Sequence, residues 1–167
     1  PNSSPGLFIS TGPNLPEIAP GDLVSVTGQV REAFQQTQLE ITSPAKVVVL
    51  GSSFIPVPTV LDPPVDNIES QAYFEALEGS LVSVPGSALV VGPTTRLGEY
   101  AVVLPKHGVD RVYQGQDQGM VIHVDDGSSE IHETRDSQEV STAVGDTVSG
   151  LVGVLSYSYG NYKLQPT

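Results

Sequence analysis

Residues 21–30 read GDLVSVTGQV, and residues 145–155 read GDTVSGLVGVL, so the chain contains nearly the same pattern twice. Each copy begins with Gly-Asp, continues with Val-Ser and has a glycine inside the predicted strand, with Gly150 as an extra residue in the second copy. The match extends over roughly forty residues in each copy. A long strand that bends at a glycine can belong to both halves of a curled sheet, so the repeat predicts two related small barrels.

The distance between the two copies is too long for a solenoid or a propeller, whose units repeat every ~20–50 residues. It fits two tandem domains of the OB type, in which five short strands curl into a small barrel. We therefore predict an all-β protein with two tandem OB-like small barrels and one short helix. The predicted modules are residues 1–62, which lack a first strand or take it from another segment, and residues 63–167, which begin with the helix.

The segments around the repeat mostly alternate between apolar and polar residues, as half-buried strands do. Two exceptions stand out. Residues 56–70 (PVPTVLDPPVDNIES) are proline-rich and are predicted to form a linker outside any sheet. Residues 71–79 (QAYFEALEG) are predicted to form a helix that Gly79 ends, with Tyr73, Phe74 and Leu77 facing the core. Further strands are expected at 111–115 and in a hairpin over 121–131.

Composition narrows the functional classes. The 167 residues carry seven Lys and Arg against nineteen Asp and Glu, a net charge of −12 that disfavours strong binding to duplex DNA. Cysteine is absent, which excludes disulfides and thiolate metal sites. No apolar run reaches the ~18 residues of a membrane span. We expect a secreted or cell-surface bacterial protein, present here as an excised piece or a mature product.

The order of several motifs over residues 6–115 supports a more specific interpretation. GLFIST, APGDLVSVTGQV and TQLEIT are followed by PVPTVLDPP, FEALEGSLVSVPG and LGEYAVV. This order resembles the region that precedes the catalytic domain in large secreted bacterial nucleases of the endonuclease/exonuclease/phosphatase class. The resemblance implies tandem OB-like modules next to a downstream catalytic domain. Two features depart from the pattern: the strand that normally precedes GLFIS is missing, and no catalytic motif of that class is found.

The candidate ligand site lies in the last predicted hairpin. OB-folds commonly bind single strands by stacking bases on aromatic side chains and by placing basic groups along the groove. Tyr157, Tyr159, Tyr162 and Lys163 fit this description, and Tyr157 and Tyr159 share a face if their strand is regular. Phe34, Arg31 and Gln38 match them loosely in the first module. Arg96 and Arg111, near Lys106 and His107, are the other basic candidates.

Metal and catalytic sites have weaker support. Asp125, Asp126 and Glu130, with Ser128, could offer oxygen ligands to Ca²⁺, but their spacing is not that of an EF-hand, and a solvated turn is the better interpretation. His123, Asp125, His132 and Glu133 could conceivably hold zinc, but we expect surface histidines instead. We therefore predict no cofactor. No serine lies in a nucleophile turn, so we do not expect the chain itself to be an enzyme.

Two functions remain open. The first is a non-catalytic OB-like module that guides nucleic acid, with single-stranded DNA as the expected ligand, or that docks the catalytic domain of a nuclease or related surface protein. The alternative is a structural or protein-interaction spacer that binds no nucleic acid, which the acidity favours.

Overall fold

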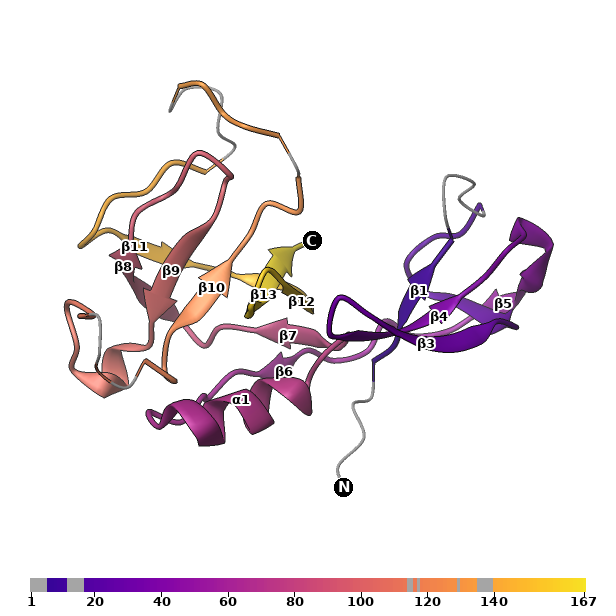
Figure 1. The fold of residues 1–167 in the computed structure, drawn as a ribbon, viewed down its shortest axis with the longest axis horizontal. Coiled ribbons are helices and arrows are strands. Elements are labelled where there is room, and N and C mark those ends of the chain that lie inside the picture. Colours follow the sequence, from indigo (N-terminus) through magenta and orange to yellow (C-terminus); the bar gives the residue numbers. More distant parts are fainter. Residues whose placement is uncertain (1–5, 12–16, 114–115, 117, 129, 135–139) are drawn as a thin grey trace. The chain divides into compact units, whose positions relative to one another are not determined.

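The fold, seen here in a computed structural model, is mostly β (Figure 1). The structure describes residues 6–11, 17–113, 116, 118–128, 130–134 and 140–167. The chain divides into two compact units, Leu7–Val57, called here the N-terminal unit, and Pro58–Thr167 with Gly6, called the C-terminal unit. No helix among the described residues is long and apolar enough to cross a membrane. The predicted all-β class with one short α-helix is confirmed.

The C-terminal unit is one curled sheet of eight strands in the order β11-β8-β9-β10-β13-β12-β7-β6. The strands are β6 (Thr59–Val60), β7 (Leu81–Ser83), β8 (Ser87–Gly92), β9 (Tyr100–Val103), β10 (Ile122–Val124), β11 (Thr147–Ser149), β12 (Val152–Ser158) and β13 (Asn161–Pro166). In chain order, β7 and β8 are two halves of one bent strand, and β11 and β12 are two halves of another. The second bent strand pairs with the first through both halves, and the Val84 N–H donates to the Leu151 carbonyl between them.

When each bent pair is counted as one strand, five strands form a closed ring in which each has two neighbours. β10 and β13 pair in parallel, whereas the other ring contacts are antiparallel. A closed ring of five strands with this single parallel contact is the OB-like arrangement expected from the sequence.

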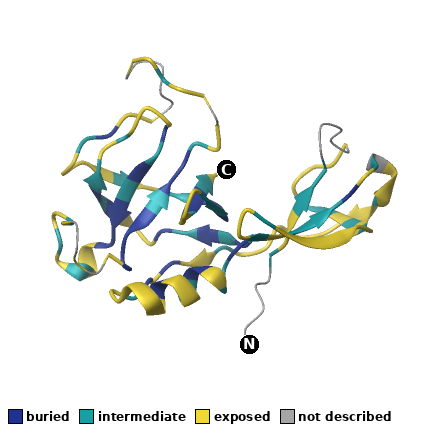
Figure 2. Ribbon diagram, in the orientation of Figure 1, coloured by how far each residue is buried: buried dark blue, intermediate teal, exposed yellow. Residues whose placement is uncertain are grey.

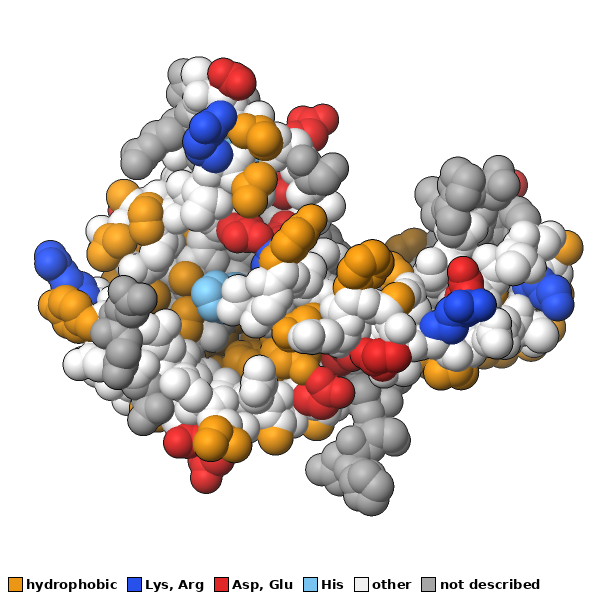
Figure 3. Space-filling view, in the orientation of Figure 1, with side chains coloured by type: hydrophobic (Ala, Val, Ile, Leu, Met, Phe, Trp, Pro, Cys, Tyr) orange, Lys and Arg blue, Asp and Glu red, His pale blue; other side chains and the backbone are white. Residues whose placement is uncertain are grey.

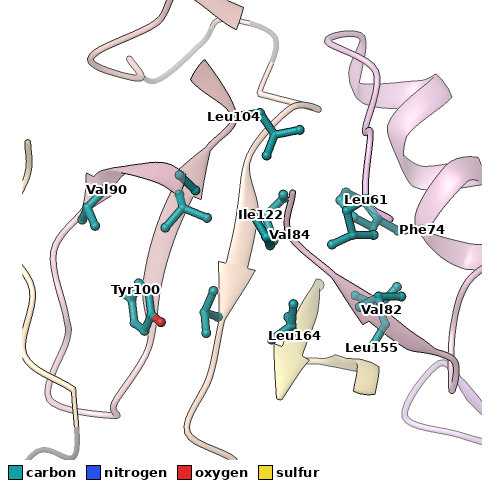
Figure 4. Packing of buried hydrophobic residues seen from close by; sticks show 13 residues of the cluster. Leu61, Phe74, Val82, Val84, Val90, Tyr100, Leu104, Ile122, Leu155 and Leu164 are labelled. Atoms are coloured by element: carbon teal, nitrogen blue, oxygen red, sulfur yellow. The ribbon is translucent and has the colours of Figure 1, made fainter. Parts of the chain in front are cut away.

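The core of this barrel is apolar and continuous (Figure 4). Side chains from the strands, such as Val90, Ile122 and Leu164, point inward, and Phe74 of helix α1 (Asn67–Glu75) packs against them. Tyr73 and Leu77 are partly buried beside Phe74, so the predicted apolar stripe does face the core.

The helix and the segment before it differ from prediction in their bounds. The Asp66 carboxylate accepts hydrogen bonds from the N–H groups of Ile68 and Glu69, so the helix begins four residues before Gln71. Within the predicted linker, Thr59–Val60 forms β6 and pairs with β7. The prediction that this segment lies outside any sheet was therefore wrong, because prolines are tolerated beside a short strand at a sheet edge.

Two further strand predictions were also wrong. Arg111–Tyr113 is irregular, and Gln114 and Gly115 lie outside the described residues. After β10 the described residues of 125–131 are irregular, with a bend at Gly127, and do not form the second strand of a hairpin. Asp125 and Asp126 explain the second case, because each carboxylate accepts a backbone N–H two residues ahead and so stabilises a turn.

The described part of the N-terminal unit, residues 7–11 and 17–57, contains five strands and the short 3-10 helix η1 (Pro44–Lys46). The strands are β1 (Phe8–Ser10), β2 (Asp22–Val26), β3 (Gln29–Ala33), β4 (Gln36–Glu40) and β5 (Val47–Ser52). β1 pairs in parallel with β4, β4 is antiparallel to β3, and β2 is antiparallel to β5. β2 and β3 are separated only by Thr27 and Gly28, where the sequence predicted a bend.

The repeat has the same geometry in both units. Gly21 and Gly145 have φ angles of 93° and 95°. The aspartate that follows each glycine accepts the N–H of the alanine three residues before it, at 2.7 Å in both copies. These two strand entrances are therefore equivalent, as the sequence predicted.

The close approach at the strand glycine is also repeated. A Cβ at Gly28 would lie 2.5 Å from the carbonyl oxygen of Glu40, and one at Gly153 would lie 2.1 Å from that of Gln165. Register extends the equivalence to four strands, so that β1, β2, β3 and β4 correspond to β10, β11, β12 and β13. Val30 pairs with Leu39 as Leu155 pairs with Leu164.

Candidate functional site

A cleft of about 290 Å³ opens in the C-terminal unit between α1, β10 and the β12–β13 turn. OB-like barrels bind their ligands on the face of strands two and three and at the loop between strands four and five, which correspond here to β9, β10 and that turn. The cleft shares β10 and the β12–β13 turn with that position, and its other wall is helix α1 instead of β9. Among the described residues, those that line it include no Lys, Arg, Asp or Glu.

The helix supplies one wall of the cleft. Asn67, Ser70, Gln71 and Phe74 all line it, at the spacing that puts side chains on one face of a helix. Two of them hold the opposite wall: the Asn67 side-chain oxygen accepts the Gln118 N–H at 2.8 Å, and the Ser70 hydroxyl donates to the Gly119 carbonyl at 2.7 Å. Gln71 lies on the same wall and is exposed.

The β12–β13 turn forms the rim. Tyr159 and Gly160 have φ angles of 49° and 88°, as a tight two-residue hairpin turn requires. This turn leaves the Tyr159 side chain 97% exposed, while the neighbouring Asn161 lines the cleft. An accessible aromatic ring thus stands near an amide that can donate and accept hydrogen bonds.

The three predicted tyrosines occupy two different environments. Tyr157 and Tyr162 meet edge to face with centroids 4.9 Å apart, and Tyr162 stacks on Phe74 at 5.8 Å. Tyr159 instead lies over the Lys163 ammonium, 5.4 Å from it. β12 ends at Ser158, so the regular strand that would place Tyr157 and Tyr159 on one face is not present.

Tyr162 is a structural link between barrel and helix as well as part of the cleft. Its hydroxyl donates to the Glu75 carboxylate of α1. Burial, together with that hydrogen bond and the charge of Glu75, raises the pKa of Tyr162 well above its usual range. Tyr162 therefore stays protonated and anchors the helix at physiological pH.

Lys163 is neutralised by two carboxylates. Its side chain is buried, with 2% of the residue exposed, and its ammonium donates to Glu99 and, at 3.0 Å, to Asp125. Burial lowers the pKa of Lys163, but the hydrogen bonds to the two carboxylates outweigh burial and raise it. The lysine is charged, and its charge is compensated inside the protein by these two carboxylates.

His123 lines the cleft beside this network. Burial lowers its pKa, and Lys163 adds to the effect, although Glu99 opposes it. The imidazole is therefore neutral at pH 7 and can either donate or accept a hydrogen bond. The expectation of surface histidines was wrong for His123, which is largely covered, and for His132, whose side chain is 10% exposed.

The acidic metal candidates are already engaged by the protein. Asp125 binds Lys163, and Asp126 lies 3.0 Å from His132 Nε2. Burial raises the pKa of Asp126, but hydrogen bonds from Ser128 and His132 outweigh it and lower the pKa overall. Glu130 is exposed, and its backbone N–H donates a hydrogen bond to the Ser128 hydroxyl. In the described part of the chain, no three His, Asp or Glu residues gather as a metal site would require.

The remaining basic candidates lie apart from the cleft. Arg96 and Arg111 are exposed and do not line it. Lys106 forms an ion pair with Asp62 instead of joining them. In the N-terminal unit Arg31 forms an ion pair with Glu40 at 2.5 Å. Figure 3 shows Lys and Arg side chains of the C-terminal unit at separate places rather than in one patch.

The sequence predicted a role for Tyr159, Tyr162 and Lys163 but not for the polar side chains of α1 that line the cleft. Asn67, Ser70 and Gln71 escaped notice because the helix was examined only for its apolar stripe. Their spacing of three and four residues, ending on Phe74, was a usable signal. The pairing of Glu99 with Lys163 had no such signal, since 64 residues separate the two.

Comparison with known proteins identifies a family for this chain but indicates no activity. A family model described as "Domain of unknown function (DUF8508)" matches residues 43–167. This range includes β5 and all eight strands of the C-terminal unit. No curated protein and no solved structure matches the chain.

Proposed function

The chain belongs to the family Domain of unknown function (DUF8508), and we propose that it is a non-catalytic binding module whose cleft takes an unstacked base of single-stranded nucleic acid. The observation that carries the proposal is a cleft beside the β12–β13 turn of an OB-like barrel, whose described lining is uncharged and includes several amide side chains, with an exposed tyrosine on that turn. The resemblance to secreted bacterial nucleases suggests the setting, in which the module guides substrate to a catalytic domain.

The groups at the cleft suit a base better than a phosphate. Gln71 and Asn161 each offer a donor and an acceptor, which is what the edge of a base requires. The ring of Tyr159 can stack on the face of a base, a contact worth about 1–3 kcal/mol. His123 is neutral, and Lys163 is paired twice, so the described residues of the cleft carry no uncompensated positive charge.

The net charge of the chain determines which nucleic acids we expect to bind and how strongly salt should weaken that binding. A net charge of −12 opposes the phosphate backbone, so duplex DNA, whose bases are stacked inside, should not bind. Affinity for a single strand should come from one or two bases, and its salt dependence should be shallow. With fewer than two phosphate contacts, the slope of log K against log salt should be smaller than about 1.4, since each contact to a single strand contributes about 0.7.

Fluorescence anisotropy with labelled single-stranded and duplex DNA, starting at about 20 mM salt, tests the proposal. We expect binding to the single strand only. Tyr159→Ala should weaken it by about 5–150-fold, the equivalent of one lost stacking contact. Asn161→Ala should weaken it in the same direction.

Tyr113→Ala is the matched control, because Tyr113 is also an exposed tyrosine of the C-terminal unit but does not belong to the β12–β13 turn. It should leave binding unchanged. Absence of single-strand binding at low salt would refute the proposal. So would binding that Tyr159→Ala and Tyr113→Ala weaken equally.

The alternative is a protein-docking module or spacer with no nucleic-acid contact. The paired state of Lys163 and the acidic surface favour it, because both remove the attraction that nucleic acid needs. In that case the same titration shows no binding of either DNA, while a protein partner binds.

A further inference from the structure

The turn between β3 and β4 repeats the turn that carries Tyr159. The register of the two hairpins makes Phe34 the counterpart of Tyr159. By the same register, Gln36 corresponds to Asn161. Phe34 is 94% exposed, close to the 97% of Tyr159. Each unit therefore presents an exposed aromatic ring at a hairpin turn, with an amide side chain two residues later.

The backbone of these turns is unfavourable for an aromatic residue. Phe34 and Gln35 have φ angles of 54° and 64°, and Tyr159 has a φ angle of 49°. A two-residue hairpin turn with positive φ at both positions favours Asn, Asp and Gly, and a bulky side chain is strained there. A ring that is almost fully exposed makes too few contacts with the fold to offset this strain. The repeated aromatic residue therefore indicates a role in binding rather than in folding.

The sheet beside the N-terminal turn places three different groups in one row. Phe8 pairs with Gln38 in the register of β1 and β4, and Gln38 pairs with Arg31 in that of β4 and β3. Cross-strand partners lie on one face, called here the N-terminal face, so a ring, an amide and a guanidinium group are neighbours. Val30 lies on the opposite face. Phe8 is 45% exposed, and Figure 2 shows that β3 is mostly exposed.

The charges of the N-terminal face cancel, unlike those of the whole chain. By the register, its described residues in the three strands also include Ser10, Gln29, Ala33, Gln36 and Glu40. Among them Arg31 is the one cation and Glu40 the one carboxylate. The Arg31 Nε lies 2.5 Å from Glu40 Oε2, and the two side chains are 56% and 43% exposed. Because so exposed an ion pair is weak, a phosphate can replace Glu40 as the partner of Arg31.

We propose that the N-terminal face is a second site for single-stranded nucleic acid, where Phe34 and Phe8 stack on bases and Arg31 contacts a phosphate. The inference rests on the proposed function, because this hairpin repeats the aromatic and amide groups assigned to a base in the C-terminal unit. Gln36 and Gln38 supply the hydrogen-bond donors and acceptors that base edges require. Each unit thus binds its own short stretch of strand.

A short oligonucleotide counts the two sites. Calorimetric titration of the full chain with tetrathymidine, at about 20 mM salt, should give two bound molecules per chain. Tyr159→Ala should remove one of them, and Phe34→Ala should remove the other. Phe54→Ala is the matched control, because Phe54 is an exposed phenylalanine of the same unit that lies outside the sheet of β1, β4 and β3, and it should leave both.

Phe34→Asn separates binding from folding. Asparagine tolerates positive φ, so hydrogen exchange in β3 and β4 should be unchanged or slower. Binding at the N-terminal face should nevertheless weaken at least about fivefold, the equivalent of one lost stacking contact. Faster exchange together with unchanged binding would show that the ring supports the fold, and would overturn the proposal.

The ion pair gives an independent test. Glu40→Gln should strengthen binding at the N-terminal face by about two- to fivefold, because a phosphate no longer has to displace the carboxylate from Arg31. Glu32→Gln is the matched control, since it removes the same charge from the opposite face, where Glu32 accepts the Thr37 hydroxyl at 2.8 Å. It should leave binding unchanged, and equal effects of the two variants would contradict the role of Arg31.

The outcomes distinguish this inference from the function on which it rests. One bound molecule that Tyr159→Ala abolishes and Phe34→Ala leaves would overturn the second site alone. One bound molecule with the opposite response would overturn the cleft of the C-terminal unit and support the N-terminal face. Absence of any bound oligonucleotide would overturn both. Duplex DNA that binds the N-terminal face as tightly as a single strand would also overturn the inference, since stacked bases cannot reach the ring of Phe34.

Discussion

Leu155 and Val30 occupy equivalent positions in the two repeats, but truncating each side chain to alanine should give very different losses of stability. Leu155 is fully buried, and Leu→Ala changes at such positions cost about 2–5 kcal/mol, from lost burial and the cavity left behind. At ~4 °C per kcal/mol for a domain of roughly one hundred residues, Leu155→Ala should lower the Tm by roughly 8–20 °C. Val30 occupies the equivalent place but is exposed, so Val30→Ala should change stability by less than about 0.5 kcal/mol.

The two units can be followed separately. All six tyrosines lie at or beyond residue 73, so tyrosine fluorescence during denaturant unfolding reports on the C-terminal unit. Hydrogen exchange read on peptides from β3 and β4 reports on the N-terminal unit. A loss of 2 kcal/mol or more from Val30→Ala would show that this face is already covered. A loss below 1 kcal/mol from Leu155→Ala would show that the barrel interior is not the packed core described here.

Three further outcomes are expected. Lys163→Met should destabilise the C-terminal unit by about 3–5 kcal/mol, because two carboxylates lose their cation. Lys106→Met, at an exposed ion pair, should cost less than about 1 kcal/mol. Chemical denaturation of both variants measures the two losses. The lowered pKa of Asp126 means that its ionised form stabilises the fold above the ordinary carboxyl value of 3.8, and that this stabilisation is lost as pH falls through the lower folded value. Acid unfolding of Asp126→Asn should therefore depend less on pH below about 4 than that of the wild type. Gly145→Ala and Gly21→Ala should each cost about 1 kcal/mol or more, because both glycines have φ near 95° and alanine is strained there; thermal unfolding of the C-terminal variant and hydrogen exchange of the N-terminal one measure the loss.

The sequence predicted the repeat and the architecture because both depend on local signals. Gly-Asp at a strand entrance and a glycine at a bend can be recognised without knowing what lies nearby in space. The site was predicted less well, because its features depend on long-range contacts. Lys163 looked available for a phosphate, and only the fold shows that Glu99 and Asp125 compensate it. The regular strand assumed through Tyr159 failed because a non-glycine residue took a positive φ at the turn.

The place of β13 in the barrel has a consequence for synthesis. β13 comes last in the sequence of the C-terminal unit, yet it lies between β10 and β12 and carries Tyr162, which bonds Glu75 at a separation of 87 residues. Until the ribosome has released these residues, β10 and β12 have no common neighbour and the helix has no anchor. We therefore expect the C-terminal unit to fold only after its translation is complete, and slowly, as proteins rich in distant contacts do.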